Sequence, residues 1–427
     1  MASLLPDFTA APHDLSAPSG GAGNETFVAR QPILDRAQSV YAYELLYRSS
    51  LKNAYDGISG TRATTDVILN ALLHIGLDRL VGRKLAFVNF DRDLLMGEMV
   101  GLLPARIVIE VLETVVPDQE VVARCHELRK LGFKIALDDV TDLGKVGELF
   151  TVADFLKVDF RASDQRQQEF IAHKASKKTI LIAEKVETGE EFERALKLGY
   201  KLVQGYFFAK PKIIPGSKIP PNKLAFLRLI QEANKPEPDL SRIEANLKRE
   251  PALVYKLLRY MNSAAFGWKQ PIDSIKHALA LLGTEQIHKW IGLLALSALT
   301  DHSSASLAPT AIIRARFCEL IARAAGLPKR SSELFLFGML SFFEAILRRP
   351  INEIIEQIDL NPDIREALLN HGQTADTVGT IYSLVTAYET GSWDMVDHYA
   401  QRLALSRQAL LTAYTESVRW AEDLGTV

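Results

Sequence analysis

A regular alternation of short apolar runs and amphipathic stretches occupies the first half of the chain. It constrains the fold more than any other feature. Each apolar run has the length of one buried strand, and helical patterns such as Asp118–Leu131 and Gly189–Leu198 separate most of them. The six runs are KLAFVNF, ARIVIEVL, FKIALDD, DFLKVDF, TILIAEKV and KLVQGYFF. Strands that alternate with helices predict an α/β fold with a parallel sheet.

A hairpin precedes these six runs. TFVARQPI and SVYAYELLY are two strand-like segments separated only by LDRAQ, which predicts an antiparallel pair. A helical pattern at Thr61–Leu73 follows the hairpin. The total of about eight strands is the number that closes a barrel, so we expect an α/β barrel over residues 25–212.

The second half of the chain has a different character. It contains one helical pattern after another, including LAFLRLIQEAN, LSRIEANLKR and EQIHKWIGLLALSAL, and no convincing alternating strand. A length of 427 residues is itself too great for one ordinary core. We therefore expect an all-α domain over residues 213–427, with the boundary in the proline-containing segment Pro211–Pro221.

Composition limits the classes of partner. A formal net charge of -2 leaves no overall electrostatic footprint for nucleic acid. No apolar run approaches the roughly 20 residues of a membrane helix, and residues 1–24 read as a disordered tail rather than a signal peptide. Cys125 and Cys318 lack metal-ligand spacing and read as buried thiols. We expect a cytoplasmic protein with neither nucleic-acid nor membrane partners.

The apolar runs end in polar side chains. Adjacent carboxylates such as Asp138 and Asp139 need a counter-charge to remain ionised together, and Lys157 shares one strand face with Asp159. Oxygen ligands at the ends of barrel strands favour a hard cation such as Mg²⁺, Mn²⁺ or Ca²⁺. A set of strand-end caps and ordinary salt bridges is the alternative reading. The polar side chains are Glu44, Asn89, Glu110, Asp138, Asp139, Lys157, Asp159, Glu184 and Gln204.

The same segments resemble, in order, the motifs of EAL domains, which are cyclic di-GMP phosphodiesterases. The matching segments are YELLYR, FVNF, EVLE, LDDV, LKVDF, LIAEKVET and VQGYFFAKP. They cover about Phe27 to Pro211, and the resemblance implies a modified TIM barrel with one antiparallel strand.

The resemblance also implies a role for each matching residue. It makes Glu44, Asn89, Glu110 and Asp138 ligands of a first metal, and Asp139 and Glu184 ligands at a second. Lys157 would help to activate water, and Glu187 would steady the loop after the aspartate pair. Arg48 and Gln204 would contact the substrate. The implied cofactor is Mg²⁺ or Mn²⁺, with Ca²⁺ as an inhibitory substitute.

The chain departs from the EAL pattern in two places. The aspartate pair is followed by VTDLGKV, which lacks the first glycine of the family's loop, and Thr141 has less backbone freedom than glycine. The segment between Asn89 and Glu110 is also short for a full helix with its loops. We therefore expect cyclic di-GMP binding with weak or conditional hydrolysis to pGpG. A catalytically silent receptor, or a scaffold acting only through protein contacts, remains the alternative.

The helical half resembles an HDOD domain. The matching segments are LLRYMNSAAFG, IDSIKHALALLG and ELFLFGMLSFFEAIL. Ser341 and Phe342 occupy the positions that supply metal ligands in the related HD hydrolases, and neither can serve as such a ligand. The three scattered histidines His277, His288 and His371 read as core or surface residues. An EAL–HDOD protein of bacterial signalling is thus expected, with the HDOD domain as a regulatory module that binds a protein partner. The resemblance also implies a homodimer.

Overall fold

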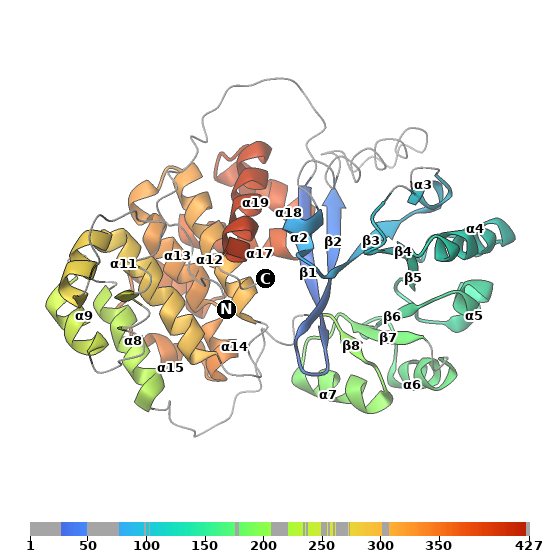
Figure 1. Cartoon of the computed structure of the whole chain (residues 1–427), viewed down its shortest axis with the longest axis horizontal. Helices are drawn as coiled ribbons and strands as arrows, with labels where there is room; N and C mark the ends of the chain where they lie inside the picture. The colour runs from blue at the N-terminus through green and yellow to red at the C-terminus, as the bar shows by residue number, and fades with distance from the viewer. Residues whose placement is uncertain are drawn as a thin grey trace. The chain divides into compact units, whose positions relative to one another are not determined.

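The structure is a computed structural model of the whole chain (Figure 1). In the first half it describes residues 27–48, residues 77–175 except 98, 99 and 102, and residues 179–205. In the second half it describes residues 221–248 except 234, 236 and 237, residues 272–300 except 273, and residues 307–423. Between 249 and 271 it describes the single positions 254, 257, 258 and 261. The chain divides into two compact units, one formed mainly by residues 22–212 and the other mainly by residues 213–427. The predicted tail 1–24, the predicted helix Thr61–Leu73 and the boundary segment before Pro221 lie outside the described residues.

The first unit contains a closed barrel of eight strands in sequence order, as the sequence predicted. The strands are β1 (Phe27–Asp35), β2 (Val40–Arg48), β3 (Leu85–Phe90), β4 (Ile107–Val111), β5 (Lys134–Leu137), β6 (Phe155–Asp159), β7 (Ile180–Glu184) and β8 (Leu202–Val203). Strand β1 pairs antiparallel with both β2 and β8, and every other neighbouring pair is parallel. The expected barrel with one antiparallel strand is confirmed.

The turn of the opening hairpin is fixed by local hydrogen bonds. Asp35 Oδ1 accepts from the backbone N–H groups of Ala37 and Ser39, both at 2.9 Å. Gln38 takes a left-handed conformation with φ 60, which closes the turn. This tight connection explains why the first two strands run antiparallel while the later ones, joined by helices, run parallel.

One buried apolar side chain from each strand fills the barrel interior. These side chains are Ile33, Ala42, Phe87, Val108, Ala136, Phe155, Ile182 and Leu202. Alternate side chains of a strand point to the same face. On each of the strands β2 to β8, the residue two positions after the floor residue therefore also points into the barrel. In each case that residue is polar. The apolar layer is the floor of the site.

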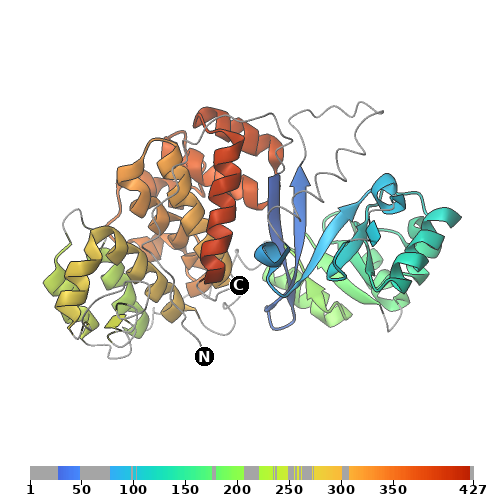
Figure 2. The ribbon, with the colours of Figure 1, turned by 45° about the horizontal axis from the view of Figure 1, so that its top comes forward.

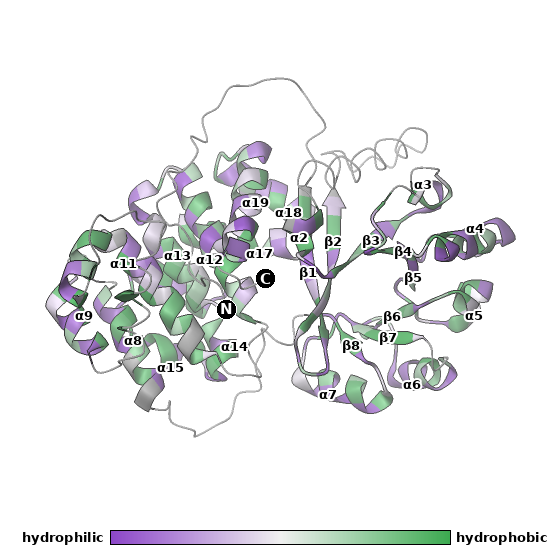
Figure 3. Cartoon of the chain, in the orientation of Figure 1, coloured by the Kyte–Doolittle hydropathy of each residue, from purple (hydrophilic) through white to green (hydrophobic). Residues whose placement is uncertain are grey.

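Helices cover the outside of the barrel, and Figure 3 shows both hydrophobic and hydrophilic residues on α4 to α7. Their ends follow the sequence signals: Asp118 caps α4 by accepting from Val121 N, and Thr188 forms a capping box with Glu191. The segment between β3 and β4 contains the short α-helix α3 in its described part. The helices of this unit are α2 (Leu77–Val81), α3 (Arg92–Met96), α4 (Gln119–Lys130), α5 (Leu143–Val146), η3 (Gly147–Thr151), α6 (Gln165–Lys174) and α7 (Gly189–Leu198).

The second unit is helical throughout its described residues, as predicted (Figure 2). Gly283, with φ 72, kinks α11. No described helix of the chain combines the length and the apolar character needed to span a bilayer. The helices are α8 (Pro221–Ala233), α9 (Leu240–Leu247), α11 (Ile275–Leu299), α12 (Leu307–Ala324), η6 (Pro328–Arg330), α13 (Ser331–Leu340), α14 (Phe343–Leu347), α15 (Ile351–Ile355), α16 (Pro362–Leu369), α17 (Thr377–Glu389), α18 (Trp393–Arg402) and α19 (Arg407–Asp423).

Truncation of the apolar floor tests the barrel packing. Phe155 is fully buried and packs edge-to-face on Phe87, with ring centroids 5.1 Å apart. We expect Phe155→Ala to lower the free energy of unfolding by about 3–5 kcal/mol in urea denaturation, because it leaves a cavity in a closed barrel. Val116→Ala, at a residue that is 66% exposed, is the control and should change it by less than about 0.5 kcal/mol. Equal effects of the two changes would contradict this packing.

Candidate functional site

Eight polar side chains, one from each strand, form a ring above the apolar floor. Seven of them follow the floor residues of β2 to β8 by two positions, although Glu44 lies inside β2 and does not end it, and the eighth is Gln31 on β1. Because β1 runs in the opposite direction, Gln31 precedes its floor residue Ile33 by two positions instead of following it. The ring consists of Gln31, Glu44, Asn89, Glu110, Asp138, Lys157, Glu184 and Gln204.

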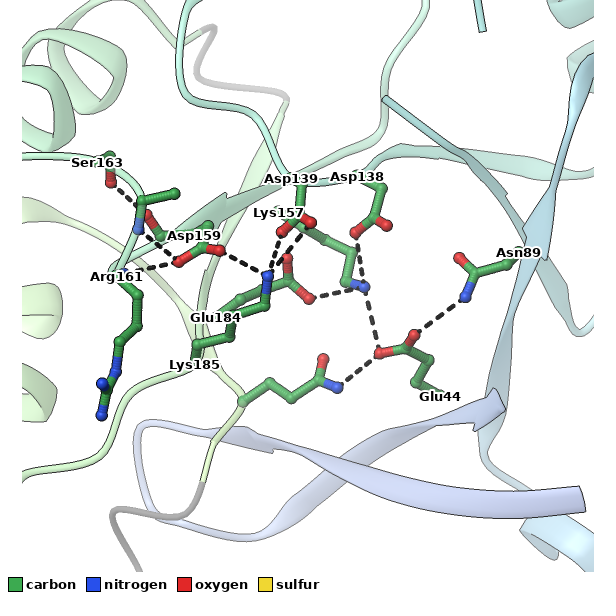
Figure 4. Close-up of polar contacts among 12 residues, drawn as sticks. Glu44, Asn89, Asp138, Asp139, Lys157, Asp159, Arg161, Ser163, Glu184 and Lys185 are labelled. Carbon is green, nitrogen blue, oxygen red and sulfur yellow. Dashed lines mark hydrogen bonds and ion pairs between the residues drawn. The ribbon is translucent and has the colours of Figure 1, made fainter. Parts of the chain in front are cut away.

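Lys157 lies at the centre of this ring (Figure 4). Its Nζ contacts Glu184 Oε1 at 2.7 Å, Asp138 Oδ1 at 3.1 Å and Glu44 Oε2 at 3.3 Å. It also contacts Glu110 Oε1. Its side chain is 1% exposed, so one buried ammonium is shared by four carboxylates.

Amide side chains complete the contacts of Glu44. Gln204 Nε2 donates to Glu44 Oε2 at 2.6 Å and to Gln31 Oε1 at 3.0 Å. Asn89 Nδ2 donates to the other oxygen, Glu44 Oε1, at 3.3 Å. Both oxygens of Glu44 are thereby oriented within the ring.

The buried carboxyl groups carry strongly perturbed pKa values. Burial raises the pKa of Glu110 well above its ordinary value. Lys157 acts in the opposite direction and lowers this pKa, but three neighbouring carboxylates raise it further. Burial likewise raises the pKa of Glu184 to about 8. For Lys157, burial disfavours the charged form, but the surrounding carboxylates raise the pKa of its ammonium above the ordinary value. One ammonium is therefore too little positive charge to keep all four carboxyls ionised.

A second cluster lies at the ends of β5, β6 and β7. Lys185 Nζ lies 2.9 Å from Asp139 Oδ1 and 2.6 Å from Asp159 Oδ2. Burial tends to raise the pKa of Asp159, but hydrogen bonds from Lys185 and from the backbone of Ala162 and Arg161 lower it overall. The adjacent aspartates thus separate: Asp138 faces Lys157 and Asp139 faces Lys185 (Figure 4).

Two residues of this second cluster have left-handed backbones. Asp139 has φ 44 and Lys185 has φ 53. Such conformations cost non-glycine residues about 1–3 kcal/mol each and persist only where the surroundings enforce them. The Asp139–Lys185 ion pair joins two strained residues at the same end of the barrel.

The loop after the aspartate pair is well bonded. Val140 N donates to Lys157 O at 2.8 Å, and Asp142 Oδ1 accepts from Gly144 N at 2.8 Å to cap α5. The left-handed conformation in this loop falls on Asp139, not on Thr141. An opening of about 170 Å³ lies beside this loop, lined in part by Glu113, Asp138 and Asp139.

The remaining predicted residues have these positions. Glu187 follows β7 and pairs with Arg161 on the loop after β6. Its predicted role in steadying the loop after Asp139 stays a prediction. Arg48 ends β2 opposite Phe27, and its side chain lies outside the described part of the chain.

Gln31, Lys185 and Arg161 were not predicted as site residues from the sequence. The hairpin register could have identified Gln31, because it lies two residues before the buried Ile33 on the antiparallel strand. Lys185 stands directly after a strand-end glutamate, but nothing in the sequence shows that its backbone is left-handed.

The donor set fits a divalent cation. One oxygen from each of Glu44, Glu110 and Glu184 lies within 4.8 Å of the other two, and a second group is formed by Glu113, Asp138 and Asp139. Four buried oxygens of the ring, namely Glu110 Oε2, Glu184 Oε2, Asn89 Oδ1 and Gln204 Oε1, have no hydrogen-bond partner among the described residues. Buried polar atoms are rarely left unsatisfied, and oxygen atoms are the ligands of Mg²⁺, Mn²⁺ and Ca²⁺.

The helical unit shows a different arrangement at Ser341 and Phe342. Arg314 is buried, donates from Nη1 to Ser341 Oγ at 3.0 Å, and stacks its guanidinium 4.1 Å from the ring centroid of Phe342. Among the described residues, two clusters of acidic side chains are close enough together to hold a metal ion, and both clusters lie in the barrel unit. His288 Nε2 contacts Ala233 O, and the backbone N–H of His277 donates to Ser274 Oγ, the N-cap of α11, at 3.2 Å.

Comparison with known proteins gives the family. The EAL domain family model matches residues 86–211, and the HDOD domain model matches residues 219–362. The uncharacterised protein YuxH of Bacillus subtilis strain 168 is 34% identical over 408 residues, which covers 93% of this chain and 98% of YuxH. The cyclic di-GMP phosphodiesterase CdgJ of Vibrio cholerae is 30% identical over 404 residues, with 93% of each chain covered. The chain belongs to the family of two-domain proteins in which an EAL domain precedes an HDOD domain.

Among solved structures, the Bacillus subtilis YkuI protein, an EAL-domain protein in complex with cyclic di-GMP and calcium, is 19% identical with a TM-score of 0.35, covering 54% of this chain and 72% of YkuI. Klebsiella pneumoniae BlrP1 in its pH 6 manganese and cyclic di-GMP complex is 24% identical with a TM-score of 0.37, covering 45% of this chain and 57% of BlrP1.

The raised pKa of Glu184 predicts a pH dependence of stability. Its folded value of about 8 lies above the ordinary 4.5, so the stability that it contributes is present below about pH 4.5 and is lost as the pH rises through 8. In metal-free buffer we expect the free energy of unfolding of the wild type to fall by about 1.4 kcal/mol per pH unit, relative to Glu184→Gln, between these values. Urea titrations at pH 5.5, 6.5 and 7.5 measure this difference. Parallel pH profiles for the two proteins would contradict it.

Proposed function

We propose that this chain is a cytoplasmic cyclic di-GMP signalling protein whose barrel binds the dinucleotide with a divalent cation and hydrolyses it to linear pGpG, weakly or conditionally. The observation that carries the proposal is the ring around Lys157. It presents three buried carboxylates and the partly buried Asp138 to one ammonium, and among the described residues it leaves oxygens of Glu110 and Glu184 without partners. The 30% identity to CdgJ over nearly the whole chain supports the choice of substrate.

Each group has a distinct task in the proposed reaction. Glu44, Glu110, Asn89 and Asp138 would hold a first Mg²⁺ or Mn²⁺, and Asp139 and Glu184 would serve a second position. A divalent cation bound there lowers the pKa of water and offsets charge on the phosphodiester. In the overall reaction, water gives up a proton as its oxygen forms a bond to phosphorus, the bond to the leaving ribose oxygen breaks, and that oxygen takes up a proton, so that one water is consumed for each cyclic di-GMP opened.

The residues of the chain supply positioning and charge. Lys157 is fixed by its carboxylate partners in the centre of the ring, where its ammonium can orient water and offset negative charge. Gln204 holds Glu44 through a 2.6 Å hydrogen bond and offers its second amide atom, Oε1, to the pocket. Arg48, at the end of β2, is proposed to contact a substrate phosphate.

The helical unit is proposed to be a regulatory module that binds a protein partner. The support is chemical. Ser341 and Phe342 stand at the positions that supply metal ligands in the related hydrolases, and the buried Arg314 contacts both of them. A guanidinium repels a cation, so this position is unsuited to metal chemistry. The barrel is then the only part of the described structure to which we assign catalysis.

Replacement of one ring carboxylate tests the proposal. We expect purified wild-type protein with Mn²⁺ to bind cyclic di-GMP and to release pGpG, measured by calorimetry and chromatography. Glu44→Gln keeps the shape of the side chain but removes its charge, so hydrolysis should fall at least about 100-fold. The double variant Glu44→Gln/Glu110→Gln should retain no tightly bound Mn²⁺, because the helical unit is expected to contribute none.

Glu193→Gln, at an exposed position of α7, is the matched control and should behave as the wild type. Binding without any product that depends on Glu44 would show a silent receptor instead of an enzyme. Absence of binding with Mg²⁺, Mn²⁺ and Ca²⁺ alike would leave only a scaffold role. Tightly bound Mn²⁺ in the double variant would contradict the assignment for the helical unit.

A further inference from the structure

Lys185 occupies a backbone position that suits glycine. It follows Glu184 at the end of β7, and its φ of 53 lies in the left-handed region, which residues other than glycine rarely adopt. The next residue, Val186, is fixed by its backbone hydrogen bond to Gln204 O at 3.1 Å. A lysine at such a position is explained if its side chain has a task that glycine lacks.

The ammonium of Lys185 has three carboxylate oxygens around it. Nζ lies 2.6 Å from Asp159 Oδ2, and 2.9 and 3.2 Å from the two oxygens of Asp139 (Figure 4). Asp159 is held from the other side, since its Oδ1 accepts from the backbone N–H groups of Arg161 at 2.6 Å and Ala162 at 2.9 Å. A cation at this point is therefore met by oxygens that come from the ends of two different strands.

The two lysines of the site differ in their freedom to move. Lys157 is 1% exposed and enclosed by the ring. Lys185 is 51% exposed, and its flexible four-carbon stem allows the ammonium to leave toward solvent without unfolding the barrel. Lys157 is thus a permanent cation of the site, and Lys185 is a displaceable one.

We propose that Lys185 is a tethered cation that occupies the position between Asp139 and Asp159 and competes with a second divalent ion for those carboxylates. The proposal rests on the proposed function, because it concerns the regulation of the same site. The first ion binds in the ring at Glu44, Asn89, Glu110 and Asp138, and a second, which needs Asp139, enters only after the Lys185 ammonium has moved away. Occupancy of the second position then depends on cation concentration, which gives the conditional character of hydrolysis a physical cause.

The test is the number of Mn²⁺ ions bound by the full chain without nucleotide, measured by calorimetry and by the loss of the free Mn²⁺ signal in electron paramagnetic resonance. We expect the wild type to bind one ion tightly and a second at least about tenfold more weakly, since a unit charge a few ångströms away opposes it. Lys185→Met keeps the length of the side chain without its charge and should tighten the second ion at least about tenfold. Lys185→Arg keeps the charge and should resemble the wild type.

Lys197→Met removes an exposed lysine of α7 and is the matched control, with no expected change. Lys185→Gly suits the left-handed backbone and should reproduce the result of Lys185→Met even if the latter folds poorly. Two equally tight ions in the wild type, unchanged in both uncharged variants, would overturn this inference while leaving the proposed function intact. No bound ion in the wild type or in either variant would overturn the proposed function as well.

Discussion

The sharing of one buried ammonium by four carboxylates is the interaction on which the rest of the site depends. Lys157 can contact Glu44, Glu110, Asp138 and Glu184 together only because they extend from separate strands of a closed barrel at the same level. The charges do not balance within the ring, so buried carboxyls must either take up protons or bind a cation. The raised pKa values of Glu110 and Glu184 describe the first case, and the proposed metal site is the second.

The barrel creates this arrangement by a simple rule of strand geometry. The buried apolar layer and the polar ring are two residues apart on every parallel strand, so the packing that stabilises the fold also sets the level of the site. The antiparallel β1 follows the same rule in reverse and contributes Gln31, which connects to Glu44 through Gln204. Fold stability and site geometry are therefore linked through the same eight strands.

Much of this could be predicted from the sequence because the side-chain period of a strand is two. Residues such as Glu44, Glu110 and Lys157 follow apolar partners at that spacing, and the ordered motifs identified the family. Lys185 could not be assigned in this way, since it lies just beyond the strand, where a left-handed backbone and not alternation sets the side-chain direction. The partners of Arg314 also required the structure, because they come from different helices.

A divalent cation in the ring around Lys157 would be located by a crystal structure of the full chain grown with Mn²⁺, through anomalous scattering at the manganese edge. We expect an anomalous peak in contact with carboxylate oxygens of Glu44 and Glu110, so that Glu110 Oε2, which has no partner among the described residues, gains one. A ring in which Lys157 keeps all four carboxylate contacts and no anomalous peak is present at millimolar Mn²⁺ would contradict this expectation.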